Sequence, residues 1–428
     1  MSTSRFDSTR ARRGGAWLVL ALALWRMTPC VQGFSEPEPW PLRDGDRIVL
    51  VGDTLVERDQ RYGYLETCLT LLNPELNLTF RNLGWSGDTV AGLSRAGFDP
   101  PEAGFKALVE QVKAAKPTVL IVGYGMADSF DGEAGLSRFE AGFNRLLGAI
   151  APAPGRLLLL SPIPHERLGP PLPDPAPHNR DLVRYSDVIR RLAEARADSL
   201  YVSQLDSFRP SDPAWHYTDD GIHLTPASYR EFGMLVAQRL GLFRRAGFGW
   251  DLALGPDGQP RRRFNVEVLE RKEVPGGYRL VLRDRYLPIP SPPVEIPDGP
   301  HFARDRSPNF RVEELPAGTY LLRIDGKVAF RGDPKALAKG IRLDRAADFE
   351  RVEKLRETIN AKNELFFHRW RPQNQTYLFG FRKHEQGNNA VEIPRFDPLV
   401  AAKEKEIAEL KKPVSHVYEI VREGEVAR

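Results

Sequence analysis

The sequence feature that most constrains the fold is an alternation of short apolar runs with amphipathic stretches between Arg43 and about Leu242. Apolar runs of this length are typical of buried strands, and the stretches between them have the spacing of amphipathic helices. We expect strands at 47–51, 77–82, 118–122, 156–160 and 199–202, and helices at 61–72, 107–115, 138–150, 181–197 and 226–240. Regular strand–helix alternation predicts an α/β fold with a parallel sheet covered on both faces.

The pattern changes after Gly241. Residues 264–269 and 278–282 alternate in polarity around a Pro-Gly-Gly turn, which indicates a β-hairpin, and a further strand and turn follow at 315–327. Helical spacing then returns at 344–367 and 398–412, with a polar and aromatic segment between them at 366–389. We therefore divide the 428 residues into a signal peptide (1–33), an α/β domain (43–243), a β-rich module (250–340) and a helical extension (344–428).

The N-terminus has the composition of an export signal. Arg12 and Arg13 precede an apolar run at 16–25, and small residues follow at 31–33, where cleavage is plausible. Ten apolar residues are too few to span a bilayer, which needs about 20, although an uncleaved N-terminal anchor remains an alternative. The sequence predicts a secreted or periplasmic protein that keeps no stable membrane span after cleavage.

Charge and composition exclude several classes of function. The chain is 41% hydrophobic and 28% charged, as expected of a folded globular protein. Its net charge of +4 comes from residues 1–33, which hold five arginines and one aspartate, so the rest is neutral. A neutral chain disfavours nucleic acid as a partner. The sequence lacks the Cys/His spacing of a zinc site and any HExxH motif, so we expect no metal and no cofactor.

Polar residues follow the ends of successive predicted strands. The first strand ends in Gly52-Asp53-Thr54, the second leads into a glycine-rich corner that includes Gly87, and the third ends in 123–128. In parallel sheets, active groups gather at the carboxyl ends of the strands. Before the last helix, Asp220 precedes His223 by three residues, so its carboxylate can bond one ring nitrogen and leave the other as a general base.

In this order the blocks resemble the SGNH/GDSL hydrolase family of esterases and acylhydrolases, which have a flavodoxin-like three-layer α/β/α fold. The resemblance covers about 44–242, roughly half of the chain. It implies that Thr54 is the nucleophile, His223 the base and Asp220 the carboxylate that orients it. It also implies that the backbone N–H of Gly87 is an oxyanion donor. We add to the site two carboxylates of the first and third blocks, as oxyanion or substrate-binding candidates: Asp53 and Asp128.

Two positions depart from the family pattern. The nucleophile position holds Thr54 where the family has serine, and the asparagine that completes the oxyanion hole is replaced by Ala127. The threonine hydroxyl allows attack, but its methyl group restricts χ1 and crowds a tetrahedral intermediate. Loss of one oxyanion donor costs about a hundred- to a thousandfold in rate. The candidates to rebuild the site are Ser86, Asp128 with Ser129, and the segment 366–389.

Other histidines and aromatic residues have two interpretations each. His165, after the fourth strand, lines the same cleft or has a loop role. Three further histidines lie in predicted loops without an identified partner: His178, His216 and His301. A group in the extension forms either a packed aromatic cluster or a sugar platform: Trp370, His368 and His384.

The resemblance and the N-terminus together predict an exported ester hydrolase, serine-esterase-like but with Thr54 as nucleophile. Its expected substrates are small-molecule or glycan esters, with acyl or acetyl groups on carbohydrates as one possibility. The alternative, motivated by Thr54 and Ala127, is a catalytically inactive SGNH-fold protein that binds a glycan or another exported protein.

Overall fold

The computed structural model describes residues 40–205, 207–208, 215–246, 249–291, 293, 309–343, 348–373, 375–386 and 389–424. These residues belong to one compact unit, Glu36–Arg428. The predicted signal peptide at 1–33 and His301 lie outside the described residues. No helix among the described residues is long and apolar enough to cross a bilayer.

The α/β domain contains the predicted parallel sheet. Its strands are β1 (Arg47–Gly52), β2 (Thr79–Asn82), β3 (Val119–Gly123), β4 (Leu157–Leu160) and β5 (Ser199–Val202). They pair in parallel in the order β2-β1-β3-β4-β5, which is the flavodoxin-like order. In sheets of this order, ligands bind outside the carboxyl ends of β1 and β3, where the strand order reverses. The predicted α/β class is confirmed.

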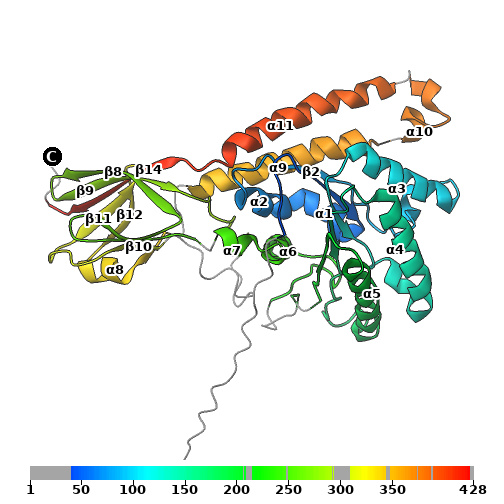
Figure 1. Ribbon diagram of the computed structural model, residues 1–428, viewed down its shortest axis with the longest axis horizontal. Coiled ribbons are helices and arrows are strands. Elements are labelled where there is room, and N and C mark those ends of the chain that lie inside the picture. Colours follow the sequence, from blue (N-terminus) through cyan, green and yellow to red (C-terminus); the bar gives the residue numbers. More distant parts are fainter. Residues whose placement is uncertain are drawn as a thin grey trace, which may run out of the picture. The chain divides into compact units, whose positions relative to one another are not determined.

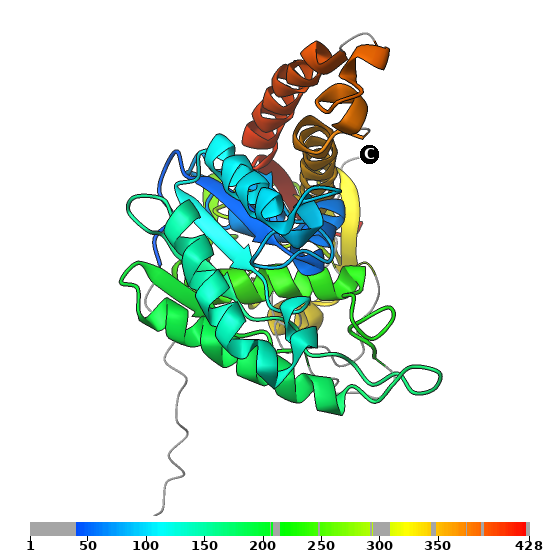
Figure 2. The same cartoon turned by 90° about the vertical axis from the view of Figure 1, so that its right-hand side faces the viewer.

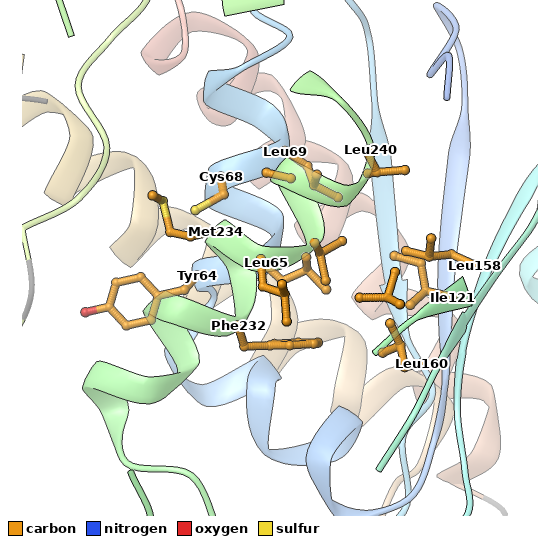
Figure 3. Packing of buried hydrophobic residues seen from close by; sticks show 14 of the residues in the cluster. Tyr64, Leu65, Cys68, Leu69, Ile121, Leu158, Leu160, Phe232, Met234 and Leu240 are labelled. Carbon is orange, nitrogen blue, oxygen red and sulfur yellow. The ribbon is translucent and has the colours of Figure 1, made fainter. Parts of the chain in front are cut away.

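Two layers of helices cover the sheet, because alternate strand residues point to opposite faces. One face is covered by α1 (Thr54–Tyr62), α2 (Tyr64–Leu71) and α6 (Pro226–Arg239). Figure 3 shows side chains of α2 and α6, such as Leu65 and Phe232, pointing toward Leu158 and Leu160 of β4. The other face is covered by α3 (Pro101–Ala115), α4 (Leu136–Ile150) and α5 (Ala176–Glu194).

The first connection differs from the predicted single helix at 61–72. Helix α1 begins directly after β1, with Thr54 as its first residue, and ends at Gly63, after which α2 starts. Gly63 has a φ of 66°, and a Cβ there would lie 2.2 Å from Oδ1 of Asn360 in α9 (Asp348–Trp370). Glycine is required at this break because the backbone is left-handed and another helix approaches closely.

The β-rich module contains two sheets rather than hairpins alone. One has the order β13-β10-β6-β7 and the other β12-β11-β14-β9-β8. The first holds β6 (Asp251–Leu254), β7 (Pro260–Phe264), β10 (Asn309–Val312) and β13 (Ile341–Arg342). The second holds β8 (Val266–Val274), β9 (Gly277–Asp284), β11 (Tyr320–Ile324), β12 (Lys327–Gly332) and β14 (Ser415–Arg422). Two short helices flank these strands, α7 (Leu242–Ala246) and α8 (Pro334–Lys339).

The last strand, β14, was not predicted from the sequence. It pairs antiparallel with both β9 and β11 and so lies in the middle of its sheet (Figure 1). The end of the segment that we had assigned to the helical extension therefore belongs to the β sheet. Local periodicity does not identify a strand whose paired residues are 94 to 144 positions away along the chain.

The helical extension consists of two long helices and short connecting turns. Helix α9 and α11 (Phe396–Leu410) correspond to the predicted segments 344–367 and 398–412 and lie side by side (Figures 1 and 2). Between α9 and α11 are α10 (Gln375–Leu378) and the 3₁₀ turns Lys383–Gln386 and Asn389–Arg395. The α/β domain contains 3₁₀ turns as well, at Leu93–Arg95, Asp128–Asp131 and Glu133–Gly135.

A buried ion pair attaches α9 to the α/β domain. Nζ of Lys362 lies 2.7 Å from both carboxylate oxygens of Glu66 in α2, and the lysine side chain is 1% exposed. Removing one partner of such a pair leaves an uncompensated buried charge, which typically costs 3–5 kcal/mol. The pair therefore specifies where α9 lies on α2.

We expect Lys362→Met to lower the free energy of unfolding by about 3–5 kcal/mol, and the double variant with Glu66→Leu to recover most of the loss. Urea denaturation measures both. The control is Lys403→Met, which breaks an exposed pair with Glu406 and should cost about 1 kcal/mol or less. Equal losses in Lys362→Met and Lys403→Met would contradict this account of the pair.

Candidate active site

The turn from β1 to α1 positions Thr54. Gly52 lets β1 approach β3 closely, since a Cβ at this residue would lie 2.2 Å from the carbonyl oxygen of Gly123. The next residue, Asp53, caps α1: its Oδ1 accepts a hydrogen bond from the backbone N–H of Leu55 at 3.2 Å. The hydroxyl-bearing residue is thereby fixed as the first residue of the helix, at the carboxyl end of β1.

The carboxylate of Asp53 also joins this turn to the end of β3. Its Oδ2 accepts a hydrogen bond from the backbone N–H of Met126 at 3.3 Å, and its own N–H donates to the carbonyl of Gly123 at 3.0 Å. Burial raises the pKa of Asp53 to about 7, and the nearby charge of Asp88 adds to this shift, although backbone hydrogen bonds oppose it. Asp53 is therefore a buried structural carboxyl group directly before the candidate nucleophile.

Gly87 lies beside Thr54, as predicted. Its backbone N–H donates a hydrogen bond to Oγ1 of Thr54 at 3.2 Å, and its φ of 70° is in the left-handed region that favours glycine. The N–H that the family resemblance assigns to the oxyanion therefore points at the hydroxyl of the candidate nucleophile.

A buried carboxylate holds the corner that contains Gly87. Asp88 is fully buried and accepts hydrogen bonds from Nε of Arg95 at 2.8 Å and from the hydroxyl of Tyr124 at 3.1 Å. Oδ1 of Asp88 also accepts from the backbone N–H of Ser94 at 3.2 Å. Charge-assisted bonds of this kind are among the stronger ones, so the corner has a defined conformation.

The segment after β3, residues 123–128, supplies the carboxyl group of Asp128 but no side-chain amide. Oδ1 of Asp128 accepts a hydrogen bond from the backbone N–H of Val90 at 3.3 Å, while its Oδ2 is buried without a hydrogen-bond partner among the described residues. Burial raises the pKa of Asp128 to about 7, and the charges of Asp53 and Asp88 contribute. Ala127, just before it, has no side-chain donor to offer an oxyanion.

The predicted contact between Asp220 and His223 is present. Nδ1 of His223 lies 2.6 Å from Oδ2 of Asp220, and the backbone N–H of His223 donates to Oδ1 at 3.0 Å. Burial opposes ionisation of Asp220, but the hydrogen bonds from His223 and from the N–H of Ile222 outweigh it and lower the pKa of the carboxyl. The carboxylate thus fixes the ring through Nδ1 and leaves Nε2 for proton transfer.

Glu166, after β4, holds the loop that carries this pair. Its buried carboxylate accepts hydrogen bonds from the backbone N–H of Thr218 at 2.8 Å and contacts Nδ1 of His216 at 2.9 Å. The backbone N–H of Glu166 donates to the carbonyl of Gly221 at 2.8 Å. His216, which had no identified partner in the sequence analysis, is therefore part of this support.

The structure arranges the candidate groups as two hydrogen-bonded pairs rather than as one connected hydrogen-bond chain. Thr54 is bonded to Gly87, and His223 to Asp220, but no hydrogen bond joins Thr54 to His223 in the described part of the chain. Hydrogen bonds between catalytic groups are often long or poorly aligned until substrate binds. The roles of these residues in catalysis therefore remain predictions.

A stack of rings beside His223 was missed by the sequence analysis. The ring of Phe130, 69% exposed, stacks on His178 at 4.3 Å, and His178 stacks on His165 at 4.5 Å. Burial lowers the pKa of His165 to about 4, and the charges of His178 and His223 add to this effect. His165 is thus neutral at neutral pH and lies near the candidate base.

The structure corrects one of the proposed replacements, Ser129. Ser129 is fully buried, its hydroxyl donates to the carbonyl of Met126 at 2.7 Å, and it contacts Nε2 of His178 at 3.0 Å. It is a structural residue, not an exposed nucleophile. Ser86 is exposed, but its backbone N–H is bonded to Glu57 of α1.

Trp370 and His368 of the extension pack against other rings. Trp370 meets the ring of Trp85 edge to face at 5.9 Å, and His368 contacts Phe367 and Phe396. His384 is exposed in a 3₁₀ turn. Among the described residues, no cluster of three or more histidine, cysteine or acidic side chains has the geometry of a metal site.

The geometry agrees with the family that the sequence matches. Residues 49–231 match the model of the GDSL-like lipase/acylhydrolase family, and this range includes Thr54, Gly87, Asp220 and His223. Residues 49–231 are a GDSL-like lipase/acylhydrolase domain. The resemblance seen in the strand-end blocks is thereby confirmed, while no curated protein matches the chain.

The GDSL-like domain and the segments after it have a fold known from solved structures. The structure of a gut microbial diltiazem-metabolizing enzyme is similar to this chain, with 15% sequence identity and a TM-score of 0.69. The match covers 89% of this chain and 98% of the other. A GDSL-like lipase from Parabacteroides merdae is 19% identical (TM-score 0.38), covering 48% of this chain and 100% of the other. The first likeness shows that the fold extends beyond the GDSL-like domain.

The raised pKa of Asp128 predicts a pH dependence of stability. A carboxyl group whose pKa rises on folding contributes stability below its unfolded pKa of 3.8, and this contribution is lost as the pH rises through about 7. We expect the wild-type protein to lose about 2 kcal/mol more than Asp128→Asn between pH 5 and pH 8. Urea denaturation at the two pH values measures this difference. Asp131→Asn, at an exposed neighbour, is the control, and equal pH dependence of wild type and Asp128→Asn would contradict the prediction.

Proposed function

We propose that the protein is an exported esterase that hydrolyses acyl or acetyl esters, with esters of carbohydrates as its substrate class. The observation that carries the proposal is that one GDSL-like domain contains both a hydroxyl bonded to a backbone N–H donor and an imidazole bonded to a carboxylate. The family supports ester hydrolysis. Export is supported by the charge and apolar pattern of residues 1–33, and a polar ester by the partial exposure of His223 and Asp220.

In the proposed mechanism, Oγ1 of Thr54 attacks the carbonyl carbon of the ester while Nε2 of His223 takes the hydroxyl proton. Asp220, bonded to Nδ1, stabilises the imidazolium that forms. Negative charge on the former carbonyl oxygen is stabilised by the N–H of Gly87 and by that of Thr54, which lies in the first turn of α1, where N–H groups have no intrahelical acceptor.

The tetrahedral intermediate then collapses. The bond to the alcohol oxygen breaks, and His223 gives its proton to the leaving alkoxide, which leaves the acyl group on Thr54. Water, deprotonated by His223, attacks this ester in the same way, and the acid and free Thr54 are released. The reaction needs no cofactor. With Ala127 in place of the asparagine, the oxyanion has one donor fewer, and we expect slow turnover.

The second candidate function is binding without turnover. Two observations favour it, the missing side-chain donor at Ala127 and the absence of a hydrogen bond between Thr54 and His223 among the described contacts. In this case the protein binds a glycan or another exported protein, and the Asp220–His223 pair serves only as a structural contact.

We expect His223→Ala to lower kcat/KM for p-nitrophenyl acetate and for acetylated sugars at least about a hundredfold, because the general base is lost. Thr54→Ser should raise kcat severalfold, because it removes the methyl group that crowds the intermediate. Initial rates of purified protein measure both. The matched control is His384→Ala, at an exposed histidine of the extension, which should leave the rate unchanged.

Absence of hydrolysis in both wild type and Thr54→Ser would overturn the esterase proposal. Calorimetric binding of a glycan that persists unchanged in His223→Ala would then favour the binding protein. Export is tested separately, by N-terminal sequencing of the protein recovered outside the cytoplasm, which should begin near residue 34.

A further inference from the structure

The N–H of Gly87 lies in a short stretch of the corner, Ser86 and Gly87, between two anchored residues. Asp88 is fixed by Arg95 and Tyr124, and before the stretch the N–H of Trp85 donates to the carbonyl of Gly52 at 3.0 Å. Between these anchors, Ser86 and Gly87 are exposed. The hydroxyl of Ser94 donates to the carbonyl of Ser86 at 3.3 Å, and the N–H of Gly87 donates to Thr54. The position of the oxyanion donor depends further on what holds the N–H of Ser86.

Glu57 of α1 holds this stretch. It lies one turn after Thr54 on the same helix, and its Oε2 accepts the backbone N–H of Ser86. Its other oxygen, Oε1, lies 3.1 Å from a guanidinium nitrogen of Arg371, which follows α9 directly. One carboxylate thus links the helix of the candidate nucleophile, the loop of the oxyanion donor and the C-terminal extension.

Two further contacts, besides the pair with Glu57, hold Arg371 in place. Its backbone N–H continues the hydrogen bonding of α9, donating to the carbonyl of Phe367 at 2.9 Å. Its guanidinium lies 3.6 Å from the centre of the Trp85 ring, a close cation–π contact on the residue just before Ser86. The guanidinium is therefore fixed between Trp85 and Glu57, and the side chain is only 25% exposed.

The Trp85 ring also contacts Arg95 and Trp370. The guanidinium of Arg95 lies 5.4 Å from the Trp85 ring, and Trp370 meets the same ring edge to face. Trp85 is thus contacted by one arginine of the GDSL-like domain and by two residues at the end of α9. The buried pair of Lys362 and Glu66, two turns earlier on α9, fixes the helix that presents them.

We propose that Arg371 is a positioning residue of the active site, which acts through Glu57 and Trp85 to hold the N–H of Gly87 where an oxyanion forms. The C-terminal extension thereby completes an active site whose reacting groups all lie in the GDSL-like domain. This matters in a chain with Ala127, because the N–H of Gly87 carries a larger share of oxyanion stabilisation when the side-chain donor is missing. The catalytic part of this inference rests on the proposed esterase function, while the structural part does not.

The test compares variants of the full chain by hydrogen–deuterium exchange of the peptide that contains residues 84–90. Arg371→Met removes the charge and keeps the length of the side chain, and we expect exchange in this peptide to rise about tenfold. Arg371→Lys keeps the charge but loses the planar stack, and it should give a smaller rise. Glu57→Gln weakens the same link from the other side and should act like Arg371→Met, so the test does not depend on one variant folding.

The matched control is Arg369→Met. Arg369 lies two residues earlier, is about as exposed and pairs with Asp397 at 2.9 Å, away from the corner. In the Arg369→Met variant, hydrogen–deuterium exchange of the peptide 84–90 should equal that of wild type. Unchanged exchange in Arg371→Met and Glu57→Gln would overturn the proposal, and so would an equal rise in Arg369→Met.

Kinetics of ester hydrolysis provide the second readout. If Arg371 positions the oxyanion donor, Arg371→Met should lower kcat about tenfold with KM within twofold of wild type, and Arg371→Lys should restore part of the rate. A rise in KM with kcat unchanged would contradict the positioning role. If the wild type hydrolyses no ester, the proposed function fails, whereas the exchange measurement still decides whether Arg371 holds the corner.

Discussion

The candidate site depends first on the carboxylate of Asp53. One of its oxygens caps α1 and the other accepts the N–H of Met126, so a single buried side chain joins the end of β1 to the end of β3. The parallel sheet brings these two strand ends together, and Gly52 allows their close approach. Thr54 is the first residue of a helix that cannot begin elsewhere while Asp53 makes both contacts. The pKa of Asp53, raised to about 7 by burial, reflects the cost of placing a carboxyl group there.

The remaining candidate groups are held in place by separate supports. The corner of Gly87 is held by the buried pair of Asp88 and Arg95, and the loop of His223 by Glu166. A third support is Arg371, which directly follows α9, lies outside the GDSL-like domain and pairs with Glu57. The first two are charged side chains that bond backbone groups of a loop, and the third acts through such a side chain, Glu57. The candidate reacting groups are therefore positioned by buried or half-buried charges around them.

Much of this arrangement was predictable from the sequence because its signals are local. The strands of the parallel sheet follow from their apolar runs, and the contact of Asp220 with His223 follows from a spacing of three residues. The start of α1 at Thr54 was missed, since the charged residues after it have no clear apolar spacing. Strand β14 was missed because its identity depends on partners far away along the chain.

The contacts that sequence reasoning could not find all join distant segments. Arg371 and Glu57 are 314 residues apart, and nothing in the local sequence of either indicates the other. The stack of Phe130, His178 and His165 likewise depends on how α5 lies against the loop after β4. Histidines that look isolated along the chain acquire partners only when the helices and loops are placed in space.

The central claim is that the hydroxyl of Thr54, activated by His223, attacks a carbonyl or an equivalent electrophile. Labelling with a fluorophosphonate tests it most directly, because the reagent bonds covalently to an activated hydroxyl and its adduct is located by peptide mass spectrometry. The account predicts an adduct on Thr54 in the wild-type protein and its loss in His223→Ala. An unlabelled Thr54, or labelling that is independent of His223, would contradict it.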